Sequence, residues 1–304
     1  MHIYTHAQYL EHQVASGHPE RPDRLRAVLD HLDRIGMVDD VPVREPRTAV
    51  PADVARVHPE AHVAFLESMR PTEGVVPVDP DTWLSPGSLP AAFYAAGALC
   101  DATRDVLSGD GTRVFCAVRP PGHHAERAAA MGFCLFNNVA IGATLALEDP
   151  AVDRVAVLDF DVHHGNGTVD VFRDDPRVLV CSSFQHPFYP NRLHDVSGPN
   201  LVYTPLDAGT DGTTFRHAIE RDWLPALQAH QPDLIYVSAG FDAHVADPLA
   251  SLCLTEADFA WITREIVAAA NESAKGRIVS ALEGGYDLQA LASSVEAHLS
   301  ALLD

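Results

Sequence analysis

The pattern of apolar and polar positions alternates along the chain between two kinds of segment. Short runs of apolar and often β-branched residues predict buried strands, whereas longer segments with an apolar residue every three or four positions predict helices. The predicted strands cover residues 3–5, 114–118, 154–159, 178–182, 234–237 and 278–282. The predicted helices cover about 22–35, 61–69, 89–107, 137–148, 213–229 and 256–270, followed by a closing helix that ends near residue 303.

This alternation predicts the fold class. Strands that are joined by helices form a mostly parallel sheet with helices on both faces, which is a three-layer α/β/α architecture. The chain has 304 residues, of which 47% are hydrophobic, so it can build one large core. No internal repeat or low-complexity segment divides it. We therefore expect a single domain over residues 1–304.

Three connections have neither a helical nor a strand pattern. Residues 41–51 contain several prolines and acidic residues, and residues 184–190 form an aromatic loop after a predicted strand. Residues 71–90 make the longest connection and contain both Pro and Gly. Connections of that length in a compact domain are usually functional or mobile, so we expect residues 71–90 to be one or the other.

The strand at 154–159 runs directly into a dense group of polar residues. Its apolar positions give way to Asp159, Asp161 and two adjacent histidines that begin at His163. If the chain stays extended, these aspartates and His163 fall at a period of two and point the same way, as a mononuclear metal centre with a supporting carboxylate requires. The alternative is a strand end whose aspartates cap the next helix. Two carboxylates beside two histidines favour the metal centre. The glycines expected to let the backbone turn sharply beneath these side chains are Gly165 and Gly167.

Polar residues also follow three other predicted strands. In open parallel sheets, ligands bind beyond the carboxyl ends of the strands, where such residues meet. We therefore expect one site at this edge of the sheet, and its convergence on several strands is stronger support than any single motif. The side chains that join the metal-centre group there are His123, His124, Asp242 and Tyr286.

Charge narrows the range of partners. Lys and Arg total 21 against 42 acidic residues, which gives a formal net charge of −21. A surface with this balance argues against binding to nucleic acid, because phosphate groups require clustered positive charge. The acidity suits a cationic substrate or product, although dispersed acidic residues are also typical of an ordinary solvated surface.

Neither a membrane nor an oxidising compartment is indicated. No segment approaches the length of an apolar membrane span, and the first residues lack the basic and apolar regions of a signal peptide. The cysteines are odd in number and mostly set in apolar runs, so we expect reduced, buried thiols in a cytoplasmic protein. They are Cys100, Cys116, Cys134, Cys181 and Cys253.

Five motifs resemble, in order, those of the histone deacetylase superfamily, and the resemblance covers most of the chain, from His18 to Tyr286. Within them, Glu283 before the Gly-Gly pair and Asn166 in the central motif are similar to the class II branch, which includes many bacterial enzymes. The resemblance implies the arginase/deacetylase fold, with one sheet of about eight strands, and a narrow acyl-lysine tunnel that ends at a zinc ion. The motifs are Arg119-Pro-Pro-Gly-His-His124, Gly132-Phe-Cys-Leu-Phe-Asn-Asn138, Asp159-Phe-Asp-Val-His-His-Gly-Asn-Gly167, Ser238-Ala-Gly-Phe-Asp242 and Leu282-Glu-Gly-Gly-Tyr286.

Three of these residues form a suitable catalytic zinc site. Asp161, His163 and Asp242 provide three ligands and leave a coordination position for water and a carbonyl oxygen. Two carboxylates offset the charge of the cation, and one imidazole keeps it a good Lewis acid. Iron(II) is the alternative metal.

The resemblance also assigns roles in proton transfer and carbonyl polarisation. His124 is the general base and acid, and His123 is an electrostatic partner. Asp159 holds His123, whereas Asn166 faces His124 and, as a neutral amide, stabilises its charged form less than a carboxylate would. The hydroxyl of Tyr286 donates to the developing oxyanion.

Substrate and potassium sites are implied in the same way. Phe133 and Tyr189 form the tunnel walls beside Gly132, and Asp81 is the rim acceptor for a substrate backbone amide. Arg24 lines the product exit or supports the floor of the site, unless it lies on a helix surface. The groups that would bind a structural potassium ion are Asp159, Asp161, the His163 carbonyl and Ser182.

Several alternatives remain at the level of function. A ureohydrolase shares the fold but needs two bridged manganese ions and more carboxylates, where Asn166 offers only an amide. A non-enzymatic acyl-lysine-binding module would lack a ligand, a histidine or Tyr286, and none is missing. The substrate is an acylated lysine side chain, another small acylated amine or an acetylpolyamine. Leu249 disfavours polyamines because an acid stands there in polyamine-preferring relatives, whereas the net charge favours them. The sequence does not decide between a monomer and a homo-oligomer.

Overall fold

The computed structural model of the protein describes residues 1–304 and contains one large sheet. Its strands lie in the order β2-β1-β5-β10-β9-β6-β7-β8, and every neighbouring pair is parallel. They are β1 (His2–Tyr4), β2 (Val43–Arg44), β5 (Arg113–Cys116), β6 (Val155–Asp159), β7 (Val178–Gln185), β8 (Leu201–Leu206), β9 (Leu234–Ala239) and β10 (Ile278–Leu282).

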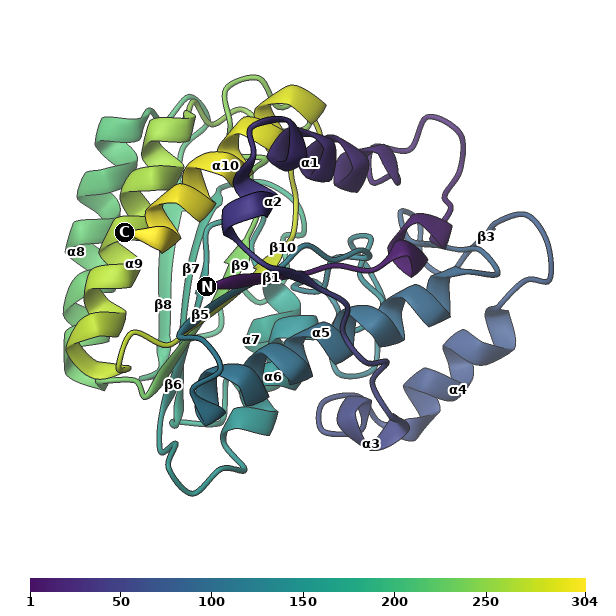
Figure 1. Ribbon diagram of the computed structural model, residues 1–304, viewed down its shortest axis with the longest axis horizontal. Coiled ribbons are helices and arrows are strands. Elements are labelled where there is room, and N and C mark those ends of the chain that lie inside the picture. Colours follow the sequence, from purple (N-terminus) through teal and green to yellow (C-terminus); the bar gives the residue numbers. More distant parts are fainter.

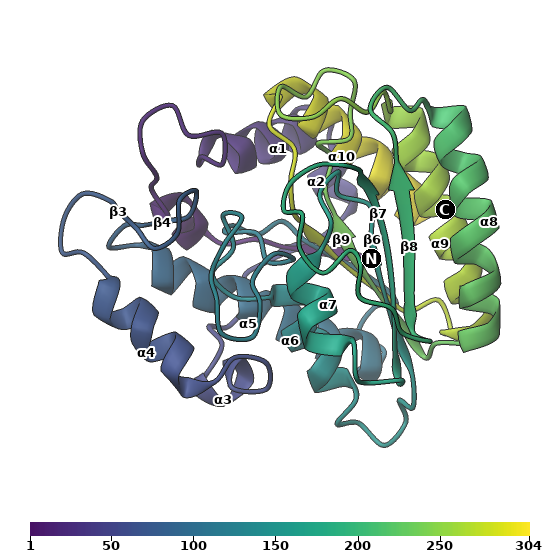
Figure 2. The same cartoon turned by 180° about the vertical axis from the view of Figure 1, so that it is seen from behind.

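Helices cover both faces of this sheet (Figure 1, Figure 2). One layer contains α5 (Ser88–Ser108), α6 (Asn138–Ala146) and α7 (Asn166–Phe172), and the other contains α1 (Asp23–Arg34), α8 (Gly212–His230), α9 (Glu256–Ser273) and α10 (Leu288–Leu303). The predicted three-layer α/β/α architecture with about eight strands is confirmed. The remaining helices are a 3₁₀ helix (Ala7–Glu11), α2 (Met37–Asp40), α3 (Pro51–Val54) and α4 (Glu60–Met69).

Some elements differ from the predicted pattern. Strand β8 was not predicted because Pro205 interrupts its apolar run, and it lies at the edge of the sheet, where proline is tolerated. Strand β7 extends to Gln185, so the first two residues of the predicted aromatic loop belong to it. The short helix α7 was missed because Gly167 and the β-branched residues there weaken a helical pattern. The connection predicted at 41–51 contains β2 and the first residue of α3.

The long connection predicted at 71–90 folds back on itself. Within it, β3 (Val76–Pro77) pairs antiparallel with β4 (Trp83–Leu84). Helix α5 then begins at Ser88, so the connection ends earlier than predicted. This small ladder fixes residues 79–82 at its tip, which brings Asp81 to the edge of the sheet where the polar residues gather.

The middle of the sheet is closed to solvent on both faces. Every residue of β6, β9 and β10 is buried between the two helical layers. This explains why these strands are continuous apolar runs rather than alternating sequences. Their carboxyl ends are therefore anchored by the best-packed part of the molecule.

Two further features can be compared with the sequence. All five cysteines are free thiols, and four are buried as predicted, whereas Cys253 is partly exposed because it lies in a surface connection. The helices all fall short of the combination of length and hydrophobicity that a transmembrane span needs.

Replacing Leu158 of β6 by alanine tests how strongly the central strand is packed. Leu158 is fully buried, so we expect Leu158→Ala to lower the free energy of unfolding by about 2–5 kcal/mol. Leu303→Ala is the matched control, because that side chain is 48% exposed and the expected change is within about 0.5 kcal/mol. Equal losses in denaturant unfolding would contradict the proposed packing.

Candidate active site

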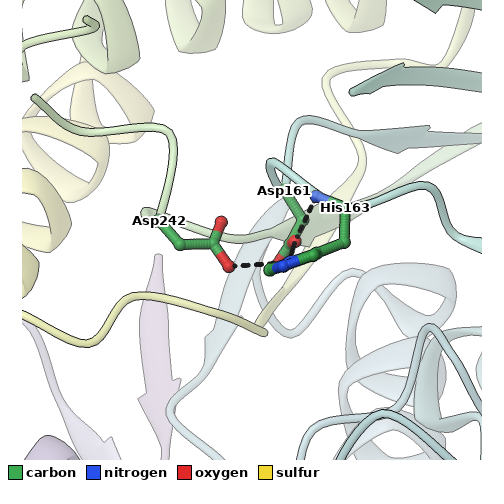
Figure 3. Close-up of side chains that lie close together, drawn as sticks. All are labelled: Asp161, His163 and Asp242. Atoms are coloured by element: carbon green, nitrogen blue, oxygen red, sulfur yellow. Dashed lines mark hydrogen bonds and ion pairs between the residues drawn. The ribbon is translucent and has the colours of Figure 1, made fainter. Parts of the chain in front are cut away.

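Three potential metal ligands meet at the carboxyl ends of two adjacent strands. Asp161 and His163 lie in the segment after β6, and Asp242 lies in the segment after β9. Figure 3 shows their side chains pointing toward one another. The His163 Nδ1 atom lies 3.0 Å from Asp161 Oδ1 and 3.2 Å from Asp242 Oδ2. All three residues are buried.

The segment after β6 is bent, whereas the sequence pattern predicted an extended chain. The Asp161 N–H donates to Asp159 Oδ1 at 3.1 Å, and the His163 N–H donates to Asp161 Oδ1 at 2.9 Å. Each carboxylate therefore holds the backbone two residues further on, as in an Asx turn. As a result Asp161 and His163 face Asp242, while Asp159 turns toward His123.

Gly165 and Gly167 are needed for close packing rather than for a sharp turn. Gly165 has a φ of −72° and precedes α7, which Gly167 helps to form, so neither adopts a left-handed conformation. A Cβ atom on Gly165 would collide with the Asp159 carboxylate, and one on Gly167 would collide with the backbone of Ala125. The expected sharp turn is thus replaced by the first turn of α7.

The three potential ligands fit a single divalent cation. Their ligand atoms all lie within 4.8 Å of one another, and the Asp242 Oδ2 atom is buried without a hydrogen-bond partner. Ligand atoms bound tetrahedrally to zinc at ~2.0–2.1 Å lie ~3.3 Å apart, which is close to the observed separations. Burial lowers the pKa of His163, but the adjacent carboxylates of Asp161 and Asp242 outweigh this and raise the pKa to about 10. The site therefore strongly favours positive charge.

Two histidines lie beside this group, in the segment after β5. The His123 Nδ1 atom lies 2.9 Å from Asp159 Oδ2, and the His124 Nδ1 atom lies 2.7 Å from Asn166 Oδ1. Burial opposes a charge on His123, but Asp159 and Asp161 outweigh it and raise its pKa well above the usual value. Burial, with the positive charge of its histidine neighbours, holds the pKa of His124 well below the usual value. His123 therefore keeps its proton, and His124 is a neutral imidazole.

A cavity of about 110 Å³ opens onto these groups. Its lining contains all five residues that were predicted to bind substrate, and also His124, His163 and Tyr286. This volume admits a slim chain and a short terminal group but no bulky ligand. The residues that line it are Asp81, His124, Gly132, Phe133, His163, Tyr189, Leu249 and Tyr286.

The tip of the β3–β4 ladder positions one wall of the cavity. The Gly132 N–H donates to Asp81 Oδ1 at 3.0 Å, and the Phe133 N–H donates to Thr82 Oγ1 at 3.0 Å. Phe133 has a φ of 69°, which is unusual for a residue with a side chain, and these two bonds hold it there. Asp81 Oδ1 is therefore already engaged within the chain. A contact with a substrate amide would use its other oxygen.

The segment after β7 forms the opposite wall. The Phe188 ring stacks on the His163 ring at a centroid distance of 5.3 Å, and the Tyr189 ring lies edge to face with His124 at 5.3 Å. Phe188 thus shields the potential ligand from one side. Its role was missed because a single aromatic residue in a loop gives no signal of what it will cover.

Arg24 supports the floor of the site and does not lie on a helix surface. It is fully buried, and its guanidinium carbon lies 4.9 Å from the centre of the Tyr286 ring. The Arg24 Nε–H donates to the Gly285 carbonyl at 2.6 Å. Burial raises the pKa of Tyr286 well above its usual value, so its hydroxyl remains a donor. Arg24 therefore fixes both the ring and the backbone beside it.

A buried carboxylate compensates Arg24 and a second arginine. Glu20 Oε1 accepts a hydrogen bond from Arg24 at 3.0 Å, and Arg119 donates to both Glu20 oxygens at 2.6 and 2.7 Å. Burial opposes the charge on Glu20, but Arg119 outweighs it and holds the pKa well below the usual value. Sequence reasoning missed this cluster because Arg119 lies 99 positions from Glu20, although Arg24 is near it in sequence.

Two more carboxylates hold segments that carry predicted site residues. Glu283 Oε2 accepts from the N–H groups of Gly122 and His123 at 2.7 and 3.2 Å, which ties the double-histidine segment to the end of β10. Asp247 accepts from the Leu249 N–H at 2.9 Å and from the Tyr286 N–H at 2.7 Å. Burial raises the pKa of each carboxyl group to about 7.

Of the residues predicted to bind potassium, Asp161 and His163 are also potential metal ligands. Asp159 and Ser182 are paired across β6 and β7. The Ser182 hydroxyl lies 3.1 Å from His164 Nδ1, so it already has one partner. Binding of potassium here stays a prediction.

Comparison with known proteins identifies the family. The histone deacetylase domain matches residues 18–302 of the chain. A probable deacetylase of Archaeoglobus fulgidus is 37% identical over 94% of this chain and 81% of its own length. An uncharacterized protein of Synechocystis is 39% identical over 99% of this chain and 98% of its own. The crystal structure of the HDA15 HD domain superposes with a TM-score of 0.93 and 32% identity, covering 99% of this chain and 89% of that one.

The chain therefore belongs to the histone deacetylase family, as the motifs predicted. Relatives named as deacetylases support deacetylase activity in general terms. Members of this family depend on a metal. In this chain, the only cluster of three or more side chains that could hold a metal ion is formed by Asp161, His163 and Asp242.

Replacing Glu20 by glutamine tests the buried charge cluster. Glu20→Gln leaves two buried guanidinium groups without a carboxylate, so we expect a loss of about 3–5 kcal/mol in the free energy of unfolding. Because the folded pKa of Glu20 is depressed, its stabilisation is fully present above the unfolded pKa of about 4.3 and is lost as the pH falls through the folded value. The difference from wild type should therefore be constant near neutral pH and shrink in acid. The exposed Glu45→Gln is the matched control, and an equally small effect at Glu20 would contradict this role.

Proposed function

We propose that the protein is a zinc-dependent amide hydrolase that removes acetyl or other short acyl groups from the side-chain amine of lysine or of a lysine-like amine. The observation that carries this proposal is the composition of the cavity. One narrow space is lined by a potential metal ligand, a neutral histidine and a tyrosine, with aromatic walls. These are the groups that hydrolysis of an unactivated amide requires.

A bound divalent cation would be held by Asp161, His163 and Asp242, and it would supply Lewis acidity and a more acidic water. Zinc suits a set of two carboxylates and one imidazole that leaves a position open. Iron(II) is the competing metal, and analysis of the purified protein distinguishes them. We also propose that a potassium ion is held by Asp159, Asp161, the His163 carbonyl and Ser182, in line with the family resemblance.

Proton transfer falls to His124 in this proposal. Its Nδ1 atom faces Asn166, which leaves Nε2 free to accept a proton from the attacking water and to return it to the leaving amine. His123 is hydrogen-bonded to Asp159 and keeps its own proton, so it acts as an electrostatic partner. The positive charge of His123 also disfavours protonation of His124 before the water attacks.

Tyr286 would stabilise the oxyanion that forms as the carbonyl is attacked. The side chain lines the cavity, Arg24 holds the ring, and Asp247 holds the backbone N–H. A donor that is fixed in advance pays no reorganisation cost at the moment of reaction. We therefore expect the hydroxyl to act in the transition state rather than in binding.

The walls of the cavity suit an aliphatic stem. Phe133 and Tyr189 offer apolar faces to the methylene groups of a lysine side chain. An acetylpolyamine is the second candidate, since Asp81 lines the cavity and would attract a distal ammonium group. Leu249 at the same cavity disfavours it, because it offers no charge there.

Turnover on a mixed panel of substrates tests the proposed function. The panel contains an acetyl-lysine peptide, a trifluoroacetyl-lysine peptide, N-acetylputrescine and N8-acetylspermidine, each with metal-loaded and chelator-treated protein. Metal-dependent release that favours the peptides supports the proposal, and a preference for the polyamines supports the second candidate. Activity on none of the four would contradict both.

Removal of the Tyr286 hydroxyl tests its role. Tyr286→Phe should lower kcat by about 10²–10³-fold with little change in KM, because one oxyanion donor is lost. Metal content and thermal stability should stay at wild-type values. Tyr94→Phe, in another part of the chain, is the control, and a wild-type kcat for Tyr286→Phe would show that the hydroxyl has no part in the reaction.

Metal analysis tests the ligand set. Asp242→Asn removes a buried charged donor, so we expect the bound zinc to fall from one equivalent per chain to a small fraction after dialysis. The surface variant Asp30→Asn should keep one equivalent. Retention of stoichiometric zinc by Asp242→Asn would remove Asp242 from the ligands.

A further inference from the structure

The amide of Asn166 is hydrogen-bonded on both sides. Its Oδ1 atom lies 2.7 Å from His124 Nδ1, and its Nδ2 atom donates to Glu126 Oε1 at 2.8 Å. Glu126 is only 8% exposed and follows His124 by two positions. The neutral amide that faces the histidine is thus backed by a buried carboxylate.

Glu126 is held in turn by an arginine from the segment after β7, which also carries Tyr189. Arg192 donates to Glu126 Oε1 at 2.9 Å and to Oε2 at 2.7 Å, which is a bidentate pair. Arg192 lies three positions after Tyr189, in the segment that follows β7. The four side chains form a continuous chain from the rim of the site to His124.

The order of donors and acceptors in this chain determines which nitrogen of His124 carries the proton. A carboxylate only accepts, so the NH₂ group of Asn166 must face Glu126 and its carbonyl oxygen must face His124. That oxygen also only accepts, so His124 carries its proton on Nδ1. The Nε2 lone pair is then directed away from Asn166, as a base that acts in the cavity requires.

We infer that Glu126 and Arg192 are positioning residues that act through Asn166 to fix the tautomer of His124. The inference rests on the proposed function of His124 in proton transfer. A carboxylate in direct contact with His124 could fix the tautomer by itself. Here Glu126 does so through the amide of Asn166, which lies between them. Arg192 keeps the Glu126 carboxylate turned toward Asn166 and links the catalytic histidine to the wall that carries Tyr189.

Replacing Glu126 by glutamine tests the relay, by which we mean the hydrogen-bonded chain from Arg192 through Glu126 and Asn166 to His124. The glutamine can present either its oxygen or its NH₂ group to Asn166, so the amide of Asn166 is free to flip and His124 is free to move its proton to Nε2. We expect kcat to fall by about 10–100-fold, the range for loss of an orienting partner, with KM changed by less than about threefold. Glu45→Gln is the matched control and should keep wild-type values.

A second substitution separates this role from a structural one. In Glu126→Gln/Asn166→Asp, the new carboxylate accepts from His124 Nδ1 by itself and from the glutamine NH₂ group. We expect its kcat to exceed that of Glu126→Gln, because a carboxylate at position 166 fixes the His124 tautomer whichever group residue 126 presents. A loss of kcat in Glu126→Gln that Asn166→Asp does not restore would overturn the inference and assign Glu126 a structural role.

The tautomer itself provides a readout that does not depend on activity. Nitrogen-15 NMR of the imidazole groups, with His124→Ala used to assign the signal, should show the His124 proton on Nδ1 in the wild type. Glu126→Gln should shift the population toward Nε2, and an unchanged Nδ1 tautomer would overturn the inference. If wild-type protein hydrolyses no amide but the tautomer shifts as expected, the proposed function fails and the relay stands.

Discussion

Four carboxylates are buried where the central strands end, and the need to compensate their charge organises the surrounding structure. Three accept a backbone N–H group from a neighbouring segment: Asp161 from Gly284, Asp242 from Val162, and Glu283 from Gly122. Asp159 accepts the N–H of Asp161 within its own segment. An unpaired buried charge costs several kcal/mol, so these bonds lock the segments after β5, β6, β9 and β10 together. Of the oxygens that face His163, Asp242 Oδ2 has no hydrogen-bond partner, and a divalent cation fits beside it.

The rest of the site can be understood as support for groups that act on one small cavity. Glu20 compensates the arginine that fixes Tyr286, and Asp247 holds the backbone of the same tyrosine. The β3–β4 ladder sets one aromatic wall through Asp81 and Thr82, and the segment after β7 sets the other. Under the proposed function, the apolar faces of Phe133 and Tyr189 would contact the aliphatic stem of an acylated lysine.

Much of the fold and of the site could be predicted from the sequence, because both depend on local patterns. The buried parallel strands are continuous apolar runs, and the polar residues directly after them meet at one edge by the geometry of the sheet. Strand β8 was missed because Pro205 breaks its run. Glu20, Asp247 and Glu126 were missed because each has one partner far away in sequence, and a lone acidic residue does not reveal a distant partner. These partners are Arg119, Tyr286 and Arg192. Asp81 was expected to accept a substrate amide at the rim, but its Oδ1 atom accepts the Gly132 N–H, which belongs to the cavity wall.

The central claim is that one bound metal ion makes this cavity a deacylase. Titration of zinc into chelator-stripped protein, with the rate of acetate release from an acetyl-lysine peptide as the signal, tests it most directly. The account predicts no turnover without metal, a linear rise and a plateau at one equivalent per chain. Turnover that is independent of metal, or a plateau that requires two equivalents, would contradict it.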